Sequence, residues 1–449
     1  MSAGIHDHLH APNRFAVIPT SVRLNADPQY SGKGVTIALL DSGFYPHPDL
    51  IEPTSRIIFY KDVTDERVLL NTSDATESWQ WHGTQTSVVA AGNGHLSDGV
   101  YRGLAHEAQL VLVKVSENGR ITEENIARGL KWVIENRERF NIRILNISLG
   151  GDEDVPCTKS IIDQAAEEAI RNGIVVVAAA GNSGADGQHS IPPANSPSVI
   201  TVGGYHDNNE LNSNSLDLYH SNFGPTADGT VKPEIVAPAM WVAAPILPGT
   251  DFYDRAEALS QLAAAEDVLR HEKIVAAHYQ HVDGTSFAAP IVTSIVAQMI
   301  EANPSLTPGA IKNILISTAD RIAGAPAIRQ GFGVVNARRA VQLAKKEEHA
   351  LNTVGCSPPR VQNGNLVFVY HDDDARTVSL AGNFNNWNPS FSRLTKDTAG
   401  LWSCRLATPG PGRYEYKFVV DDKRWVEDPS NGLKVSDAYG GLNSLLVIQ

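Results

Sequence analysis

The chain has few cysteines, and their spacing does not suggest a disulfide framework. Its 449 residues include only Cys157, Cys356 and Cys404, an odd number at wide spacing. This spacing is typical neither of a disulfide scaffold nor of a cysteine metal site. A reducing cytoplasm is the expected location, although a mature secreted form cut from a longer precursor would show the same pattern.

The sequence also lacks long apolar runs and an excess of basic residues. No stretch approaches the roughly 18 uninterrupted apolar residues of a membrane span. The start, MSAGIHDHLHAPNRF, has no basic segment followed by an apolar core, as a secretory signal would. The formal net charge is −13, from 37 basic and 50 acidic residues. Phosphate binding needs a basic surface, so we expect neither nucleic acid nor a membrane as a partner.

Up to about residue 340, apolar segments of strand length alternate with amphipathic helices. Strands are predicted at 34–40, 109–115, 141–149, 174–180 and 198–203, and helices at 122–139 and 158–173. This alternation predicts an α/β fold, a mostly parallel doubly wound sheet covered on both faces. In such folds the active site lies beyond the carboxyl ends of the strands, where Asp41 and Asn182 are placed.

Near residue 345 the composition changes, because a polar stretch containing Pro-Pro precedes short alternating segments. These lie at 366–372, 377–384, 401–407, 413–421 and 442–449, with Gly, Asn and Pro between them, and predict a small all-β sandwich of immunoglobulin-like type. The expected division is an N-terminal extension (1–25), the α/β domain (26–348), a linker (349–365) and the sandwich (366–449).

The stretch HVDGTSFAAP, residues 281–290, places Ser286 at the start of an apolar helix. Helix capping is the ordinary role of such a serine. A nucleophile would additionally need a base and a group that orients the base. Asp41 in LLDSG and His82 in WHGTQ are isolated polar residues flanked by small ones, and Asn182 in AAAGNSG could supply an oxyanion donor.

These motifs resemble those of the subtilisin-like serine peptidases, or subtilases. The segments ALLDSG, HGTQ, LNISLGG, AAAGNSG, SNFGPT, KPEIVAP and GTSFAAP occur in the family's order between about residues 30 and 340. The resemblance implies Ser286 as nucleophile, His82 as general base and then acid, and Asp41 as the residue that orients the imidazole. Asn182, with the Ser286 backbone N–H, would bind the oxyanion.

The same resemblance implies a substrate groove. An extended peptide would pair with the backbone of Ser148, Leu149 and Gly150. The wall of the primary pocket would be formed by Ala179, Ala180 and Gly181. Alignment by eye places Ile191 near the base of this pocket, where some relatives have glycine. We therefore predict a preference for small or medium apolar residues before the scissile bond.

Several positions depart from the family pattern. Phe287 replaces the usual methionine after the serine, and Ala239 replaces a common glycine. A helical insertion is predicted within residues 249–278, with Leu259, Leu262 and Leu269 on one side; a lid, an oligomer contact and mere decoration are all open roles. The acidic loops that bind structural calcium in some relatives are not identified. The alternating histidines at 6–10 fit a mobile terminus better than a metal site.

The C-terminal segment resembles the glycogen- and starch-binding modules of branching enzymes and of the AMP-activated protein kinase β subunit. AGNFNNWNP, GRYEYKFVVDDKRWVEDPSN and GLNSLLVIQ carry this resemblance. The family's ligand positions fall on Trp387, Lys417, Trp425 and Asn443, where aromatic planes would stack on sugar rings. The alternative is that both tryptophans belong to the core of the sandwich.

Together, these patterns predict a cytoplasmic serine endopeptidase that acts on protein or peptide substrates and carries an α-glucan-binding module. The chemistry is expected to need no cofactor, and a structural calcium ion is left unassigned. Two alternatives come from other classes. A glycoside hydrolase would need paired carboxylates beside a sugar cleft, and a non-catalytic glycogen-binding scaffold would need a broken triad.

Overall fold

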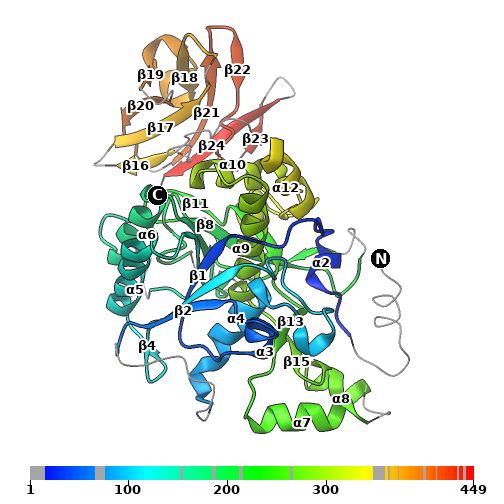
Figure 1. Cartoon of the computed structure of the whole chain (residues 1–449). Helices are drawn as coiled ribbons and strands as arrows, with labels where there is room; N and C mark the ends of the chain where they lie inside the picture. The colour runs from blue at the N-terminus through cyan, green and yellow to red at the C-terminus, as the bar shows by residue number, and fades with distance from the viewer. Residues whose placement is uncertain are drawn as a thin grey trace.

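The structure is a computed structural model. Figure 1 shows its α/β region, coloured from blue to yellow, and its β region, coloured orange to red. The described residues are 16–65, 76–151, 155–184, 189–211, 216–262, 266–346, 359–362, 365–372, 374–397, 401–410, 412–431, 434–437 and 441–448. The histidines at 6–10 and Cys356 lie outside them.

A mostly parallel sheet forms the centre of the α/β region. Its strands follow the order β12-β8-β7-β6-β1-β3-β2, and β9 pairs with β8. All pairs along this path are parallel, whereas β9 is antiparallel to β8. The strands are β1 (Thr36–Asp41), β2 (Ile57–Asp62), β3 (Gln109–Lys114), β6 (Ile142–Ile147), β7 (Val175–Ala179), β8 (Ile200–His206), β9 (Asp217–Leu218) and β12 (Ile235–Pro238).

Five of these strands match the predicted segments, and two of the three that were not predicted lack the sequence pattern of a buried strand. β2 lies at the sheet edge and is only partly buried, so its pattern lacks a continuous apolar run. β12 is short and ends in Pro238, a residue that disfavours a strand. The predicted α/β fold class is confirmed.

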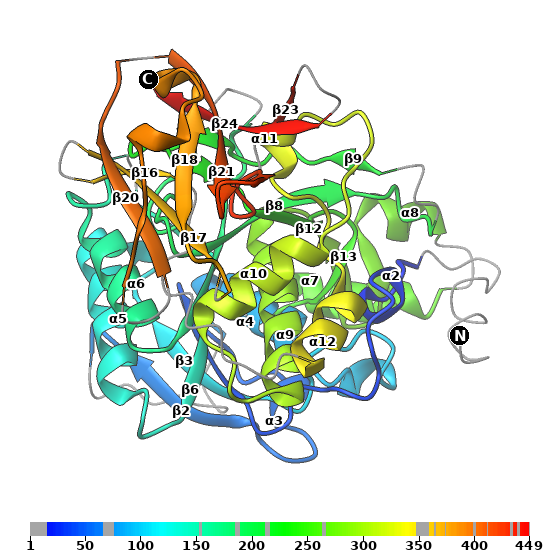
Figure 2. The ribbon, with the colours of Figure 1, turned by 90° about the horizontal axis from the view of Figure 1, so that it is seen from above.

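Helices cover both faces of the sheet, as Figures 1 and 2 show for α5 and α6 on one side and α9, α10 and α12 on the other. Neighbouring strand residues therefore enter different cores: Ile37 and Leu39 join the core under α9, and Ala38 and Leu40 the core under α5. The helices are α4 (Trp81–Ala91), α5 (Glu123–Asn136), α6 (Ile161–Arg171), α9 (Thr285–Ala302), α10 (Pro308–Thr318) and α12 (Ala337–Lys346).

Helix α9 passes through the middle of the larger core. Among the described residues it is the one helix whose length and mean hydropathy would allow a membrane crossing, and 83% of it is buried inside the structure. A central helix of a folded core meets the same test. Pro290 lies within this helix and supplies no N–H to the carbonyl of Ser286, four residues earlier.

The insertion consists of two helices rather than the single helix that was predicted. They are α7 (Asp251–Ser260) and α8 (Glu266–His271), followed by β14 (Ile274–Ala276) and β15 (Tyr279–Val282), which form a small sheet with β13 (Val242–Pro245). Leu269 is buried and Leu259 is partly buried in a separate small core. Leu262 is 59% exposed, so its expected place beside the other leucines was wrong.

Residues near the start of the described chain pack onto the α/β region. Val17 and Ile18 are buried, and the short helix α2 (Thr20–Arg23) follows them. The Arg23 guanidinium is buried, with its Nε 3.2 Å from Asp207 Oδ2. These residues lie within the segment that we expected to be an N-terminal extension, and they contact the α/β region. The other short helices are α3 (Pro48–Ile51), α11 (Ala327–Gln330), η1 (Ser78–Gln80) and η2 (His95–Ser97).

The C-terminal region is a sandwich of two antiparallel sheets. One sheet has the order β16-β17-β20-β19, and the other β18-β21-β24-β23 with β22 paired to β21. The strands are β16 (Arg360–Gln362), β17 (Asn365–His371), β18 (Val378–Gly382), β19 (Thr395–Lys396), β20 (Leu401–Ala407), β21 (Gly412–Val420), β22 (Arg424–Val426), β23 (Lys434–Ser436) and β24 (Leu442–Ile448). β16 lies within the segment expected to be a linker and pairs with β17.

Candidate active site

The predicted catalytic residues come from four separate elements. Asp41 is the last residue of β1, His82 is the second residue of α4, and Ser286 is the second residue of α9. Asn182 follows the end of β7. The carboxyl ends of β1 and β7 lie at the same edge of the parallel sheet, which brings their loops together as the sequence predicted.

Asp41 and His82 are hydrogen-bonded. The distance from His82 Nδ1 to Asp41 Oδ1 is 2.8 Å. The same carboxylate oxygen accepts the backbone N–H of Ser42 at 2.7 Å, and Asp41 is only 1% exposed. Gly83 lets α4 begin this close to β1, because a Cβ there would lie 2.2 Å from the Gly43 carbonyl oxygen. The bond fixes the His82 tautomer with Nδ1 protonated and Nε2 available.

The Asp41 carboxylate also sets the basicity of His82. Burial of the imidazole lowers its pKa, but the negative charge of Asp41 and its hydrogen bond outweigh burial. The net result is a pKa raised above the ordinary value of 6.5. A more basic imidazole is a better acceptor for the proton of a hydroxyl nucleophile.

Ser286 is linked to the end of β6 through Ser148. The Ser286 hydroxyl donates to the Ser148 carbonyl oxygen at 3.3 Å, and the Ser148 hydroxyl donates to the Ser286 carbonyl oxygen at 2.9 Å. Pro290 leaves the Ser286 carbonyl free to accept this second bond. The hydroxyl thus points to Ser148 here, while the Phe287 ring lies 6.0 Å from the His82 ring, between centroids.

Asn182 is oriented by the start of α9. Its Oδ1 accepts the backbone N–H of Thr285 at 2.9 Å and the Thr285 hydroxyl at 3.1 Å. Two donors on Oδ1 fix which end of the amide is oxygen and leave Nδ2 on the other side. Asn182 is exposed, and the backbone of Gly284 passes it in a conformation, φ +141°, that favours glycine. These bonds hold Asn182 against the residue before Ser286, and no acceptor for Nδ2 is found among the described residues.

The residues expected to line the groove lie on neighbouring loops. Ser148, Leu149 and Gly150 follow β6, while Ala179 ends β7 and is followed by Ala180 and Gly181. Ile191 lies against Gly150, since a Cβ added at Gly150 would lie 3.3 Å from Ile191 Cδ1. The structure therefore places a branched side chain against the expected peptide-binding edge, and the subsites stay predictions.

Sequence reasoning missed two residues that hold this site together. The Thr86 hydroxyl donates to Asp41 Oδ2 at 3.1 Å, from the same face of α4 as His82. Asn222 accepts the Ser183 N–H at 2.6 Å and donates to the His189 carbonyl at 2.9 Å, so one side chain holds the backbone of the residue after Asn182. The i, i+4 spacing of His82 and Thr86 was the available signal for the first. Asn222 belongs to SNFGPT, one of the motifs that resemble the family, but the sequence assigned it no role.

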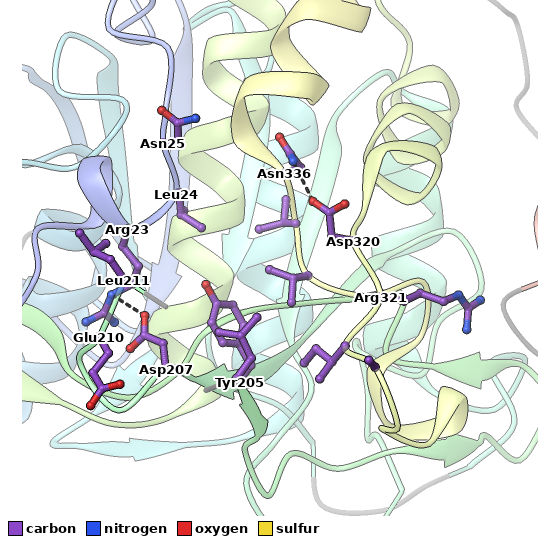
Figure 3. A pocket seen from close by; sticks show the side chains of 15 residues that line it. Arg23, Leu24, Asn25, Tyr205, Asp207, Glu210, Leu211, Asp320, Arg321 and Asn336 are labelled. Carbon is purple, nitrogen blue, oxygen red and sulfur yellow. Dashed lines mark hydrogen bonds and ion pairs between the residues drawn. The ribbon is translucent and has the colours of Figure 1, made fainter. Parts of the chain in front are cut away.

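Two features outside this site bear on metal and ligand binding. Among the described residues, no group of three or more His, Cys, Asp or Glu side chains is arranged to hold a metal ion. Figure 3 shows a cavity of about 550 Å³ with the Arg23–Asp207 pair on one side and Asp320, bonded to Asn336, on the other. None of the predicted site residues lines it. A structural calcium ion therefore stays unassigned, as in the sequence analysis.

The predicted sugar-binding residues lie on or beside one sheet of the sandwich. Trp387 and Trp425 are 6.4 Å apart between ring centroids, and Trp425 is 46% exposed. Neither belongs to the core, which instead contains Trp402. Lys417 Nζ lies 2.7 Å from Asp437 Oδ2, and Asn443 Nδ2 donates to Glu415 Oε2 at 2.8 Å. The alternative of two core tryptophans is therefore wrong.

Comparison with known proteins places both regions in families. Residues 32–335 match the model of the subtilase family, and residues 365–449 match the model described as the glycogen recognition site of AMP-activated protein kinase. The chain therefore belongs to the subtilase family. It is a subtilisin-like serine protease with a carbohydrate-binding module of the second family, as the sequence motifs predicted.

Individual relatives agree with this classification. The chain is 35% identical over 325 residues to serine protease AprX of Bacillus subtilis, covering 69% of this chain and 67% of that protein. It is 30% identical over 315 residues to subtilisin BL of Lederbergia lenta, covering 70% and 92%. The structure of fervidolysin from Fervidobacterium pennivorans shares the fold, with a TM-score of 0.53, 19% identity and coverage of 89% and 55%.

Proposed function

We propose that Asp41, His82 and Ser286 form the catalytic triad of this protease. The observation that carries the proposal is the 2.8 Å bond between Asp41 and His82 at the same sheet edge as the start of α9. Among the described residues, His82 is the one side chain that could pair with Asp41 as a cation, because the other contacts of the carboxylate are to Ser42 and Thr86. An aspartate that orients a histidine beside a helix-terminal serine is the arrangement that activates a hydroxyl.

In the proposed mechanism, the Ser286 hydroxyl turns from the Ser148 carbonyl toward His82 Nε2 when substrate binds. His82 takes the proton as Ser286 attacks the scissile carbonyl carbon, and Asp41 stabilises the imidazolium. The oxyanion receives Asn182 Nδ2 and the Ser286 backbone N–H, with the positive end of the α9 dipole behind them. His82 then protonates the leaving amine, and water hydrolyses the acyl-enzyme by the reverse proton path. These steps use no cofactor.

The test is active-site labelling. A serine-directed sulfonyl fluoride is expected to modify Ser286 alone and to abolish casein cleavage, and peptide mapping by mass spectrometry identifies the labelled residue. Labelling at another serine, or casein cleavage that survives full modification of Ser286, would refute the assignment. Inactivity of both native and labelled protein on casein would favour a non-catalytic scaffold instead.

We further propose that the sandwich docks the protease on glycogen or a similar α-glucan. A tryptophan pair outside the core, of which Trp425 is exposed, favours this second role, because aromatic planes offer apolar faces to the C–H surfaces of sugar rings. The match of residues 365–449 to a glycogen recognition module supports the ligand class. Docking would raise the local concentration of the protease near glycogen-bound proteins and leave the chemical step unchanged.

Co-sedimentation with glycogen tests this role. The intact protein is expected to pellet with glycogen and to be released by soluble malto-oligosaccharide. Trp387→Ala and Trp425→Ala are the test variants and are expected to pellet less. The matched control is Leu211→Ala, which removes an exposed apolar side chain from the α/β region, whereas a change at Trp402 would disturb the core of the sandwich. Intact protein that stays in the supernatant, or pelleting that oligosaccharide does not reverse, would refute docking on an α-glucan.

A further inference from the structure

The insertion ends close to the segment that leads into α9. After α8, Lys273 adopts a left-handed backbone conformation, φ +63°, before β14 begins. Its carbonyl accepts the N–H of His281 at 2.8 Å. Its side chain extends to Asp283, with 2.7 Å between Lys273 Nζ and Asp283 Oδ2. The insertion therefore contacts a residue only three positions before Ser286.

Asp283 is held from several directions. Besides Lys273, its Oδ1 accepts the backbone N–H of Trp241 at 3.2 Å and lies 3.8 Å from His281 Nδ1. The Trp241 ring packs on the His281 ring, 4.5 Å between centroids. Burial raises the pKa of Asp283, but its contacts with His281 and Lys273 outweigh burial, so the pKa is lowered and the carboxylate is charged. Asp283 is a fixed anionic anchor.

The anchor is continuous with the proposed oxyanion site. Gly284 donates its N–H to the Ala239 carbonyl at 2.7 Å, and Thr285 donates to Asn182 Oδ1 at 2.9 Å. Ser286 follows directly. A displacement of Asp283 would thus move Gly284 and Thr285, and with them both the nucleophile and the amide of Asn182. Small displacements of this kind lower turnover more than binding.

We propose that Lys273 is a positioning residue for Ser286, acting through Asp283, and that the insertion contributes to catalysis by this contact. The inference rests on the proposed triad. A purely structural role for the insertion is the competing explanation, since Tyr279 also fastens this region by donating its buried hydroxyl to Asp49 at 2.7 Å. The two explanations differ in whether turnover or only stability depends on Lys273.

The chain offers a matched control within the same insertion. Arg255 and Glu272 form an ion pair at 2.5 Å, and Arg255 is 58% exposed, close to the 50% of Lys273. The described contacts of this pair do not include Asp283 or residues 284–286. Arg255→Met therefore removes a comparable charge pair from the insertion without touching the proposed anchor.

The experiment compares Lys273→Met, Lys273→Arg and Arg255→Met in the full chain on a short soluble peptide. Lys273→Met is expected to lower kcat about three- to tenfold with KM nearly unchanged, a modest effect because the pair is partly exposed. The rate of sulfonyl fluoride labelling of Ser286 should fall in parallel. Lys273→Arg should restore both quantities, and Arg255→Met should change neither.

A double-mutant cycle strengthens the test. If Lys273 acts through Asp283, adding Lys273→Met to Asp283→Asn should cost little beyond Asp283→Asn alone. An unchanged kcat in Lys273→Met, or the same loss of kcat in Lys273→Met and Arg255→Met, would overturn the inference. Ser286→Ala distinguishes failure of the proposed triad from failure of the positioning role. An active Ser286→Ala protein refutes the triad. If Ser286→Ala is inactive but Lys273→Met keeps full turnover, only the positioning role is refuted.

Discussion

The proposed substrate groove at the sheet edge and the predicted sugar-binding residues of the sandwich both combine polar and apolar groups, but they are organised differently. In the groove, the functional groups already hold one another: Asp41 is buried and bonded to His82, and Asn182 is fixed by Thr285. On the sandwich, Lys417 and Asn443 are bonded to the acids Asp437 and Glu415. A sugar would have to compete for these side chains.

This difference has an energetic consequence. Groups preorganised around a transition state need no rearrangement when charge develops, so each contributes strongly to rate. Groups that exchange one partner for another on binding contribute only the difference between the two hydrogen bonds. We therefore expect large effects from single changes in the groove and small effects from polar changes on the sandwich, where Trp387 and Trp425 should dominate the binding free energy.

The strongest test of this comparison removes the nucleophile or the base. Ser286→Ala and His82→Ala are each expected to lower kcat by roughly a million-fold, the scale found for triad removal in subtilisin. The double variant should be little worse, because the two residues act in one proton transfer. Steady-state kinetics on a chromogenic peptide measure this, and losses that multiply in the double variant would contradict a shared step.

The next effect concerns the oxyanion donor. Asn182→Ala should lower kcat by about 10²–10³, as removal of the corresponding donor does in subtilisin, with little change in KM. Its Nδ2 is expected to meet charge that is present only in the transition state. Asn182→Asp is the informative companion, since a carboxylate cannot donate in the ionised state. An unchanged kcat in the alanine variant would remove Asn182 from the site.

The pH dependence of the groove should follow His82. A protonated imidazole cannot accept the serine proton, so kcat/KM should fall about tenfold per pH unit below the pKa of His82. Because Asp41 raises this pKa, the midpoint is expected above pH 6.5. Asp41→Asn should lower kcat and shift the midpoint downward. A profile that stays flat from pH 8 to pH 5 would exclude a histidine base.

On the sandwich, the expected effect is smaller and confined to binding. Trp387→Ala and Trp425→Ala should each weaken glycogen affinity by about tenfold or more, the usual scale for a tryptophan at the centre of a binding surface. Lys417→Met should weaken it less, because Asp437 already pairs with the ammonium group. Turnover of a short peptide should be unchanged in all three, and a parallel loss of turnover would show that the regions are coupled.

The smallest expected effect is on specificity. Ile191 lies against Gly150, and its branched side chain should shorten the primary pocket. Ile191→Gly is expected to shift the preference by a few-fold toward larger residues before the scissile bond, since a change of a few methylenes is worth about 1–3 kcal/mol. A peptide library varied at that position measures the shift. Strong selection for Phe or Tyr by the unmodified protein would refute the short pocket.

Much of the fold was predictable because its signals are local. The helix at 122–139 was predicted from Ile126, Leu130, Val133 and Ile134, and all four are buried in the structure. Strands with continuous apolar runs were predicted for the same reason. The two helices of the insertion were not separated, because the pattern of leucines continues through residues where the helical backbone does not, and Leu262 is exposed.

The site was predictable as a set of residues but not as a set of contacts. Asp41, His82, Asn182 and Ser286 could be selected from motifs, whereas Thr86 and Asn222 act through bonds that only the folded chain creates. The contact between Lys273 and Asp283 likewise joins an insertion to a motif that sequence reasoning treated separately. Predictions about calcium, the cytoplasmic location and the domain boundaries stay predictions.

Pro290 has a consequence for how this enzyme can be evolved or engineered. A proline inside a helix costs about 3 kcal/mol relative to alanine, so Pro290→Ala would be chosen by any search for stabilising changes. The new amide would compete with the Ser148 hydroxyl for the Ser286 carbonyl and loosen the nucleophile from the substrate-binding edge. We therefore expect thermal stability and turnover to oppose each other at this position, which the melting temperature and kcat of Pro290→Ala would measure.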